Sequence, residues 1–174
     1  IAVVGSGPSG MSCAYQLARR GYRVTVFESL PKPGGMLRYG IPDFRLDKAI
    51  LDRRLAQLEA EGVVYRTGAH IGVNLPVDEL REDVQAIVLA CGSEKPRRLG
   101  VPGNDLEGIH YAMDYLTQQN HRVAGATELP APLITAQDRH VAVIGGGDTG
   151  SDCVGTAIRQ GARCVTQLQY HDQP

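Results

Sequence analysis

The stretch Ile1-Ala-Val-Val-Gly-Ser-Gly-Pro-Ser-Gly10 joins a run of small and β-branched residues to the glycine spacing G-x-G-x-x-G. These glycines allow a tight turn, and backbone N–H groups at the start of the following helix attract a pyrophosphate. The spacing returns about 140 residues later, where the run 140–144 precedes Gly145-Gly-Gly-Asp-Thr-Gly150. A strand before and a helix after each loop predict a dinucleotide site. Two such sites in one chain indicate that electrons pass between two dinucleotides.

The first fingerprint extends beyond its glycines. A helix is predicted over residues 8–20, and a strand follows over residues 22–28. Ala14 and Leu17 fall where a small and an apolar residue pack that helix against a sheet. Glu28 ends the strand, and an acidic side chain there accepts hydrogen bonds from the adenosine ribose. We interpret the whole pattern as a dinucleotide site; the alternative is a glycine-rich turn with a solvated Glu28.

The rest of the chain alternates between the same two kinds of element. Apolar residues at helical spacing, or in short continuous runs, predict helices at 47–61 and 111–119, a helical turn at 76–81, and strands at 62–65 and 86–90. Residues 31–42 are punctuated by glycine and proline and are expected to form a long loop. The alternation predicts an α/β fold with parallel sheets, made of two Rossmann-like dinucleotide-binding units in tandem.

Composition excludes several classes of function. The net charge is −1 and the charged fraction is 21%, so neither a nucleic-acid nor a membrane partner is indicated. No apolar run approaches the ~20 residues that a membrane span needs. The four cysteines form no C-x-x-C pair and the five histidines show no ligand spacing, so no metal site is predicted. We expect reduced thiols in a cytoplasmic protein.

Residues Gly34-Gly-Met-Leu-Arg-Tyr-Gly-Ile-Pro-Asp-Phe-Arg-Leu-Asp-Lys48 carry a resemblance to a known family. They are similar to the segment that follows the acidic strand end in the glutamate synthase small (beta) subunit family, which uses FAD and NAD(P)H. The flavin module of dihydropyrimidine dehydrogenase is related. Further matches at 90–93, 96–97, 101–109 and 115–120 extend the resemblance over essentially the whole chain.

The resemblance implies that FAD occupies the first site. The residues implied to bind it are Gly5, Ser6, Gly7, Pro8, Ser9, Gly10, Glu28, Gly35, Met36, Arg45, Ile71 and Gly92. Arg45 is expected to pair with the pyrophosphate, and Ile71 to offer its backbone near the adenine. The alternatives are a surface charge for Arg45 and a flexible turn for Gly34-Gly35.

The same resemblance implies that NAD(P)H occupies the second site, on Gly145, Gly146, Gly147, Asp148, Thr149 and Gly150. The family usually has alanine where this chain has Gly150. A carboxylate beside a pyrophosphate is repulsive, so Asp148 is expected to cap the helix together with Thr149. Residues 165–171 contain neither an acid nor a basic pair. The missing acid favours NADPH over NADH, with His171 as a weak contact.

As a function, the resemblance implies a flavoprotein oxidoreductase that passes a hydride from NAD(P)H to FAD. Electrons would continue through iron–sulfur clusters, held in the parent protein or a partner, to a glutamate synthase large subunit that forms glutamate. No catalytic side chain is nominated, because the flavin carries the chemistry. The alternatives are a pyrimidine-reducing or ferredoxin-linked relative and a non-catalytic dinucleotide-binding fragment.

The expected domain organisation is nested. Residues 1–110 would form the first segment of an FAD-binding domain, residues 111–138 a connector, and residues 139–174 the start of an inserted NAD(P)H-binding domain. The second unit is expected to be incomplete, because the chain ends just after the strand predicted to be its second.

Overall fold

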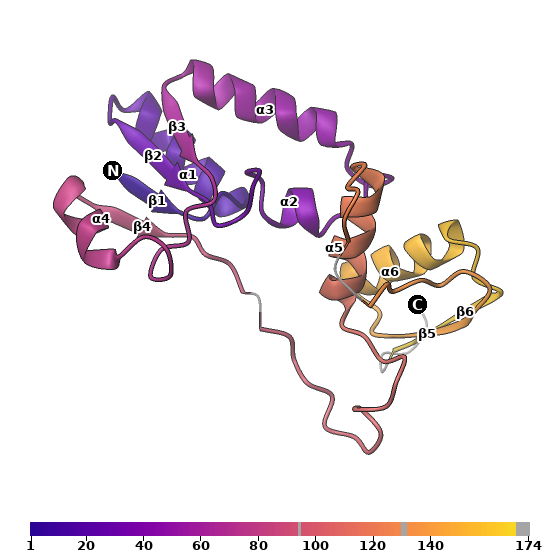
Figure 1. Cartoon of the computed structure of the whole chain (residues 1–174). Coiled ribbons are helices and arrows are strands. Elements are labelled where there is room, and N and C mark those ends of the chain that lie inside the picture. Colours follow the sequence, from indigo (N-terminus) through magenta and orange to yellow (C-terminus); the bar gives the residue numbers. More distant parts are fainter. Residues whose placement is uncertain (94, 130–131, 170–174) are drawn as a thin grey trace. The chain divides into compact units, whose positions relative to one another are not determined.

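The computed structural model describes residues 1–93, 95–129 and 132–169. The chain divides into two compact units (Figure 1). Unit 1 comprises Ile1–Arg38 and Leu46–Glu94, and unit 2 comprises Tyr39–Arg45 and Lys95–Pro174. The chain therefore leaves unit 1 for the short segment 39–45, returns, and passes into unit 2 again after Glu94.

Unit 1 is built on a four-stranded parallel sheet in the order β3-β2-β1-β4. Its strands are β1 (Ala2–Val4), β2 (Val24–Phe27), β3 (Val63–Arg66) and β4 (Ile87–Leu89). Its helices are α1 (Pro8–Arg19), α2 (Met36–Tyr39), α3 (Lys48–Ala60) and α4 (Val77–Asp83), with the last residue of α2 in unit 2. Val4 lies opposite both Phe27 and Leu89, so three strands end at one edge of the sheet.

Helices cover both faces of this sheet (Figure 1). On one face α1 and α3 pack on the central strands through a buried cluster made of Val3, Met11, Ala14, Val24, Val26, Leu51, Leu55, Leu58 and Val63. On the other face, α4 and the loop before it bury Ala2, Phe27, Leu75 and Leu80. Burial on both faces suits the continuous apolar sequence of β1, Ala-Val-Val.

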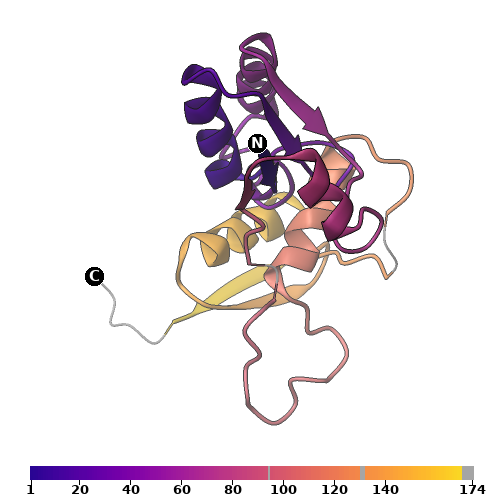
Figure 2. The ribbon, with the colours of Figure 1, turned by 90° about the vertical axis from the view of Figure 1, so that its left-hand side faces the viewer.

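Unit 2 contains the parallel strands β5 (His140–Ile144) and β6 (Cys164–Leu168) and the helices α5 (Ala112–Val123) and α6 (Asp148–Arg159). The two helices pack against each other and against the strands through Tyr115, Leu116, Ala136, Cys153 and Ala157. Figures 1 and 2 show α6 lying over the two strands. Residues 95–111 form a long loop before α5 (Figure 2).

The α/β fold with parallel strands is confirmed, and the predicted elements occur within a few residues of their expected bounds. The helix α2 was not predicted, because glycines and prolines surround it on both sides. The division into residues 1–110, 111–138 and 139–174 stays a prediction. The predicted connector holds α5, which packs on α6 inside unit 2.

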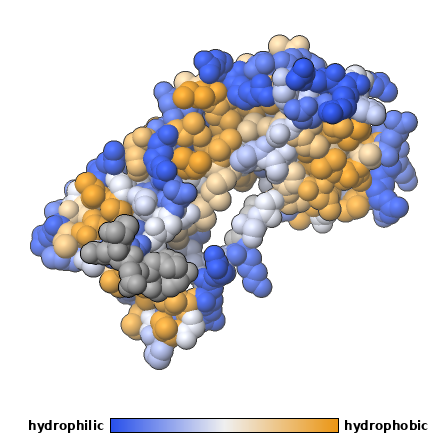
Figure 3. Space-filling model, turned by 180° about the vertical axis from the view of Figure 1, so that it is seen from behind, coloured by the Kyte–Doolittle hydropathy of each residue, from blue (hydrophilic) through white to orange (hydrophobic). Residues whose placement is uncertain are grey.

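The surface mixes hydrophilic and hydrophobic side chains (Figure 3). Leu89, Ile144 and Leu168 lie near the carboxyl ends of their strands and are exposed. In the part of the chain that is described, no helix is long and apolar enough to cross a membrane.

Candidate dinucleotide-binding sites

The first glycine loop begins where β1 ends and is packed against its neighbours. The Gly5 N–H donates to the Phe27 carbonyl at 2.8 Å, which continues the pairing of the sheet into the loop. A Cβ on Gly5 would lie 2.3 Å from the Ala90 oxygen, and one on Gly10 would lie 1.9 Å from the Gly5 oxygen. These two positions require glycine because the backbone atoms of strand, loop and helix lie too close together to leave room for a Cβ.

The opposite side of this loop is open. A Cβ on Gly7 would meet no atom within 4 Å. Gly7 is also the N-cap of α1 and makes no side-chain cap, while Pro8 follows with no N–H to donate. The first turn of a helix leaves N–H groups without an intrahelical acceptor and carries positive partial charge. The loop therefore fits a pyrophosphate, which brings oxygens and negative charge and needs room at Gly7.

Glu28 stands beside this loop at the end of β2 and is only 5% exposed. Its carboxylate accepts hydrogen bonds from the Ser6 N–H at 3.2 Å, from the Ser6 hydroxyl, and from the Leu30 N–H at 2.9 Å. The Ser6 hydroxyl oxygen in turn accepts from the Gly34 N–H at 2.8 Å. The acidic residue that sequence analysis singled out is thus held against the glycine loop, as a ribose acceptor must be.

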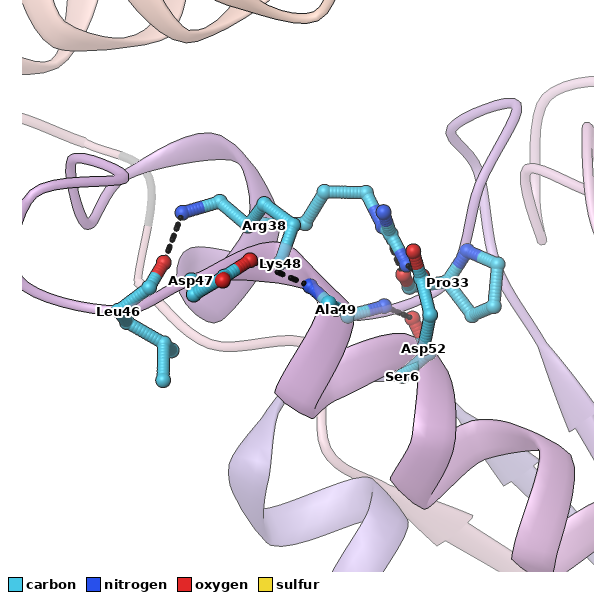
Figure 4. A network of polar contacts seen from close by, with 9 residues as sticks. Ser6, Pro33, Arg38, Leu46, Asp47, Lys48, Ala49 and Asp52 are labelled. Carbon is cyan, nitrogen blue, oxygen red and sulfur yellow. Dashed lines mark hydrogen bonds and ion pairs between the residues drawn. The ribbon is translucent and has the colours of Figure 1, made fainter.

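The Gly34-Gly35 pair lies directly on the glycine loop. Gly35 has φ +49°, and a Cβ there would lie 2.8 Å from the Gly7 Cα. Figure 4 shows how the following residues hold this turn: the Arg38 Nε donates to the Pro33 oxygen at 2.6 Å, and the Arg38 guanidinium pairs with Asp52 of α3. The pair is therefore packed against the glycine loop and held there by the contacts of Arg38, and its contact with a cofactor stays a prediction.

Asp47 and Lys48 fix the start of α3 at the other end of this network. The Asp47 carboxylate accepts from the Ala49 N–H at 2.9 Å as the N-cap of α3, and the Lys48 ammonium donates to the Leu46 oxygen at 3.0 Å (Figure 4). A cap of this kind stabilises a helix by about 1 kcal/mol. The helix that carries Asp52 is thereby held in place under the glycine turn.

Three further residues implied to bind FAD lie in neighbouring segments of unit 1. Met36 begins α2 directly after Gly35 and is 47% exposed. Ile71 pairs with Leu75 in the loop between β3 and α4. Gly92 follows β4 with φ +74°. Their contact with a cofactor stays a prediction.

Arg45 belongs to unit 2, where two carboxylates of α6 surround it. Its Nη1 donates to the Asp152 carboxylate at 2.9 Å, and its Nη2 lies 3.5 Å from that of Asp148. The hydrogen bond to Asp152 and the charge of this carboxylate are the main causes that raise the pKa of Arg45. The predicted contact of Arg45 with a pyrophosphate stays a prediction, and so does its alternative as a surface charge, since the side chain is 43% exposed and paired with these carboxylates.

The predicted capping role of Asp148 and Thr149 is wrong. Gly147 is the N-cap of α6, no side chain caps this helix, and Asp148 is already its first residue. A side chain inside the first turn is not placed to accept from the N–H groups that an N-cap reaches. Asp148 instead lies beside the Arg45 guanidinium, which provides the opposite charge.

The second glycine loop repeats the construction of the first. The Gly145 N–H donates to the Leu168 carbonyl at 2.8 Å, and a Cβ on Gly150 would lie 2.3 Å from the Gly145 oxygen. Above Gly147 a Cβ would again meet no atom within 4 Å. This loop therefore shares the close approach of its last glycine to its first and the open space at Gly147, whereas a Cβ on Gly145, unlike one on Gly5, would meet no atom within 4 Å.

Two glutamines, one near the end of β6 and one just after it, contact the second glycine loop, and sequence analysis did not single them out. The Gln167 Nε2 donates to the Gly145 oxygen at 2.8 Å. The Gln169 side chain lies over Gly146, where a Cβ would be 1.9 Å from its Oε1. Sequence analysis could have found them by aligning the strand that follows the second glycine loop with the strand that follows the first. His171 lies outside the described residues.

Comparisons with known proteins identify the family. The chain is 48% identical over 177 residues to the glutamate synthase [NADPH] small chain of Mycobacterium tuberculosis, across 100% of this chain and 36% of that protein. It is 42% identical to the glutamate synthase [NADH] of Schizosaccharomyces pombe, across 97% of this chain and 8% of that protein. These relatives confirm the resemblance to glutamate synthase small subunits that the motifs indicate.

Among solved structures, Mycobacterium tuberculosis FprA in complex with NADPH matches with a TM-score of 0.72 and 27% identity, over 88% of this chain and 35% of that one. The chain spans about a third of the length of the bacterial small chain it matches. The profile of the pyridine nucleotide-disulphide oxidoreductase family matches residues 1–174. This chain belongs to that family.

Proposed function

We propose that this chain is part of a flavoprotein that passes a hydride from NAD(P)H to FAD. The observation that carries the proposal is the repeated strand–loop–helix, in which the last glycine of each fingerprint packs on the first and the space at Gly7 and at Gly147 is open. Bound FAD would supply the hydride acceptor, so that two electrons and one proton leave NAD(P)H and NAD(P)+ remains. The residues of this chain bind and orient the two nucleotides.

The first site is the one that suits FAD. Its glycine loop, the buried Glu28 and the Gly34-Gly35 turn form one hydrogen-bonded unit, which prepares the adenosine and pyrophosphate positions before a ligand arrives. Arg45 is proposed to reach the pyrophosphate, while Met36, Ile71 and Gly92 are proposed to line the nucleotide. NAD(P)H would then use the second site, on Gly145–Gly150.

We further propose that the electrons go on to a glutamate synthase large subunit through iron–sulfur clusters outside this chain. The names of the relatives support this destination, since they are glutamate synthases that use NADPH or NADH. Glutamate formed from 2-oxoglutarate and glutamine-derived ammonia would be the product.

Anaerobic titration of the full-length protein, loaded with FAD, tests the first half of the proposal. We expect NADPH or NADH to bleach the visible absorbance of the flavin. A flavin that stays oxidised at saturating NADPH and NADH contradicts the hydride-acceptor role.

Reconstitution with a glutamate synthase large subunit tests the second half. We expect oxidation of NAD(P)H that depends on both glutamine and 2-oxoglutarate, with formation of glutamate, when both subunits are present, and no such oxidation when either is left out. Bleaching without glutamate would instead favour a pyrimidine-reducing or ferredoxin-linked acceptor, which assays with those acceptors would reveal.

A further inference from the structure

The two glycine loops can be aligned residue by residue through their strand pairing. Gly5 and Gly145 each donate their N–H, at 2.8 Å, to the carbonyl of the last residue of the neighbouring strand, which is Phe27 in one unit and Leu168 in the other. The residue after that carbonyl is Glu28 in unit 1 and Gln169 in unit 2. The two side chains therefore hold the same place in the two sites.

The loop residue that faces this side chain also differs between the two units. In unit 1 the Ser6 hydroxyl and N–H donate to the Glu28 carboxylate. In unit 2 the residue in the place of Ser6 is Gly146, and the Gln169 amide occupies the space that a side chain there would fill. A loop serine thus accompanies the carboxylate in unit 1, and a loop glycine accompanies the carboxamide in unit 2.

A carboxylate and a carboxamide differ in the groups that they can bind on an adenosine ribose. A carboxylate accepts hydrogen bonds from both ribose hydroxyls but repels a 2′-phosphate, and this is why dinucleotide sites with an acid at this position select NAD. A carboxamide is neutral and has both an acceptor oxygen and N–H donors. It can bond either a hydroxyl or a phosphate oxygen.

We propose that Gln169 makes the second site accept a 2′-phosphate, and that it is the residue of this chain that admits NADPH there. The inference rests on the proposed function, in which the second site holds NAD(P)H. It goes further by assigning the choice between the coenzymes to one side chain and its loop partner, Gly146.

The test uses adenosine halves of the coenzymes, which bind without any redox step. Calorimetry on the full-length protein with FAD bound would measure the affinities for 2′,5′-ADP and 5′-AMP. In Gln169→Glu, we expect the dissociation constant of 2′,5′-ADP to rise at least about tenfold relative to that of 5′-AMP, through charge repulsion at contact distance. NADP+ and NAD+ should show the same change in their ratio.

Two further variants sharpen the result. Gln137→Glu adds the same charge at an exposed position before β5 and should leave the ratio unchanged. The double variant Gly146→Ser/Gln169→Glu rebuilds the Ser6–Glu28 arrangement in the second site. We expect it to keep the selection against 2′,5′-ADP.

The outcomes separate this inference from the proposed function. Should Gln169→Glu leave the ratio of the two affinities unchanged, or weaken both ligands equally, Gln169 does not govern the choice. If the unaltered protein binds neither adenosine half nor NADP+ nor NAD+, the second site holds no pyridine nucleotide, and the proposed function fails as well.

Discussion

The buried carboxylate of Glu28 depends on the donors around it. Burying a carboxylate costs free energy unless hydrogen bonds replace its hydration, and Ser6 and Leu30 provide such bonds. These bonds also fix the carboxylate beside the glycine loop. The same side chain therefore contributes to the stability of unit 1 and stands where we propose that the nucleotide binds.

Glu28→Gln keeps the shape of the side chain but turns one oxygen into a donor that faces other donors. We expect it to lower the free energy of unfolding by about 1–3 kcal/mol, the cost of a buried polar group left unpaired. The amount of FAD bound to the full-length protein should fall with it. Urea unfolding and FAD content measure the two effects.

Glu82→Gln is the matched control, because Glu82 is exposed on α4 and should change neither quantity. A Glu28→Gln protein that keeps both its stability and its FAD would show that the carboxylate is not needed.

Gly35→Ala tests the close approach of the two glycine segments. The new Cβ would lie 2.8 Å from the Gly7 Cα, so the turn has to move away from the loop that fits the pyrophosphate. The positive φ itself costs about 1–2 kcal/mol for a residue with a side chain. We expect a larger loss of stability than this, together with weaker binding of FAD, measured by urea unfolding and flavin titration.

Gly68→Ala separates the two causes. Gly68 has φ +66°, but a Cβ there would meet no atom within 4 Å, so it carries the backbone cost alone. Equal losses of stability and of FAD affinity in the two variants would mean that contact with Gly7 plays no part.

At the scale of elements, the segment 39–45 is fastened to the helices of unit 2. The Asn120 Nδ2 donates to the Tyr39 oxygen at 2.9 Å and to the Ile41 oxygen at 3.2 Å. The Phe44 ring lies 3.7 Å from the central carbon of the Arg159 guanidinium, which stacks on its face. Polar and aromatic contacts thus hold an irregular segment on regular elements.

Asn120→Ala removes the donor that both carbonyls share. Because Asn120 is 6% exposed, we expect unfolding of unit 2 to become easier by about 1–3 kcal/mol and amide exchange in residues 39–45 to speed up. Gln137→Ala removes the amide of an exposed residue of unit 2 and should leave both readings unchanged. Unaltered exchange in residues 39–45 of Asn120→Ala would contradict the fastening role.

The elements themselves could be predicted from sequence, whereas this attachment could not. Leu51, Leu55 and Leu58 repeat at helical spacing, and all three are buried, so α3 follows from local pattern. Phe44 and Gly155 are far apart in the chain, and their contact depends on how α6 is placed. A glycine inside a helix marks a close approach, but it does not name the residue that approaches.

At the scale of the whole molecule, the chain forms the same strand–glycine loop–helix arrangement twice. The two fingerprints were sufficient to predict both loops, since glycine spacing after a strand is a local signal. The role of Gln169 was not predicted, because the residue opposite Gly146 follows from strand register, which no short motif encodes. For the same reason, sequence analysis did not predict that two carboxylates lie beside Arg45.

Both units contain buried tyrosine or cysteine side chains with a raised pKa, which predicts that the protein loses stability at high pH. Burial is the main cause that raises the pKa of Tyr65, in unit 1, from 10.0 to about 12. In unit 2, burial raises the pKa of Cys153 from 9.0 to about 11, and that of Tyr115 also rises. In the unfolded state each group loses its proton at its ordinary pKa. The unfolded state therefore binds fewer protons at high pH, and the free energy of unfolding falls as the pH increases.

The stabilisation from these groups is therefore complete below about pH 9 and declines as the pH passes from there through about 11 to 12. Urea midpoints measured at intervals across this range should fall steadily. Tyr65→Phe removes a hydroxyl that is buried without a hydrogen-bond partner among the described residues, and it should flatten the fall for unit 1. Cys153→Ala should do the same for unit 2, whereas Tyr22→Phe alters an exposed ring and should not. Midpoints that stay level up to pH 12 in the unaltered protein would show that these acids are not protected by the fold.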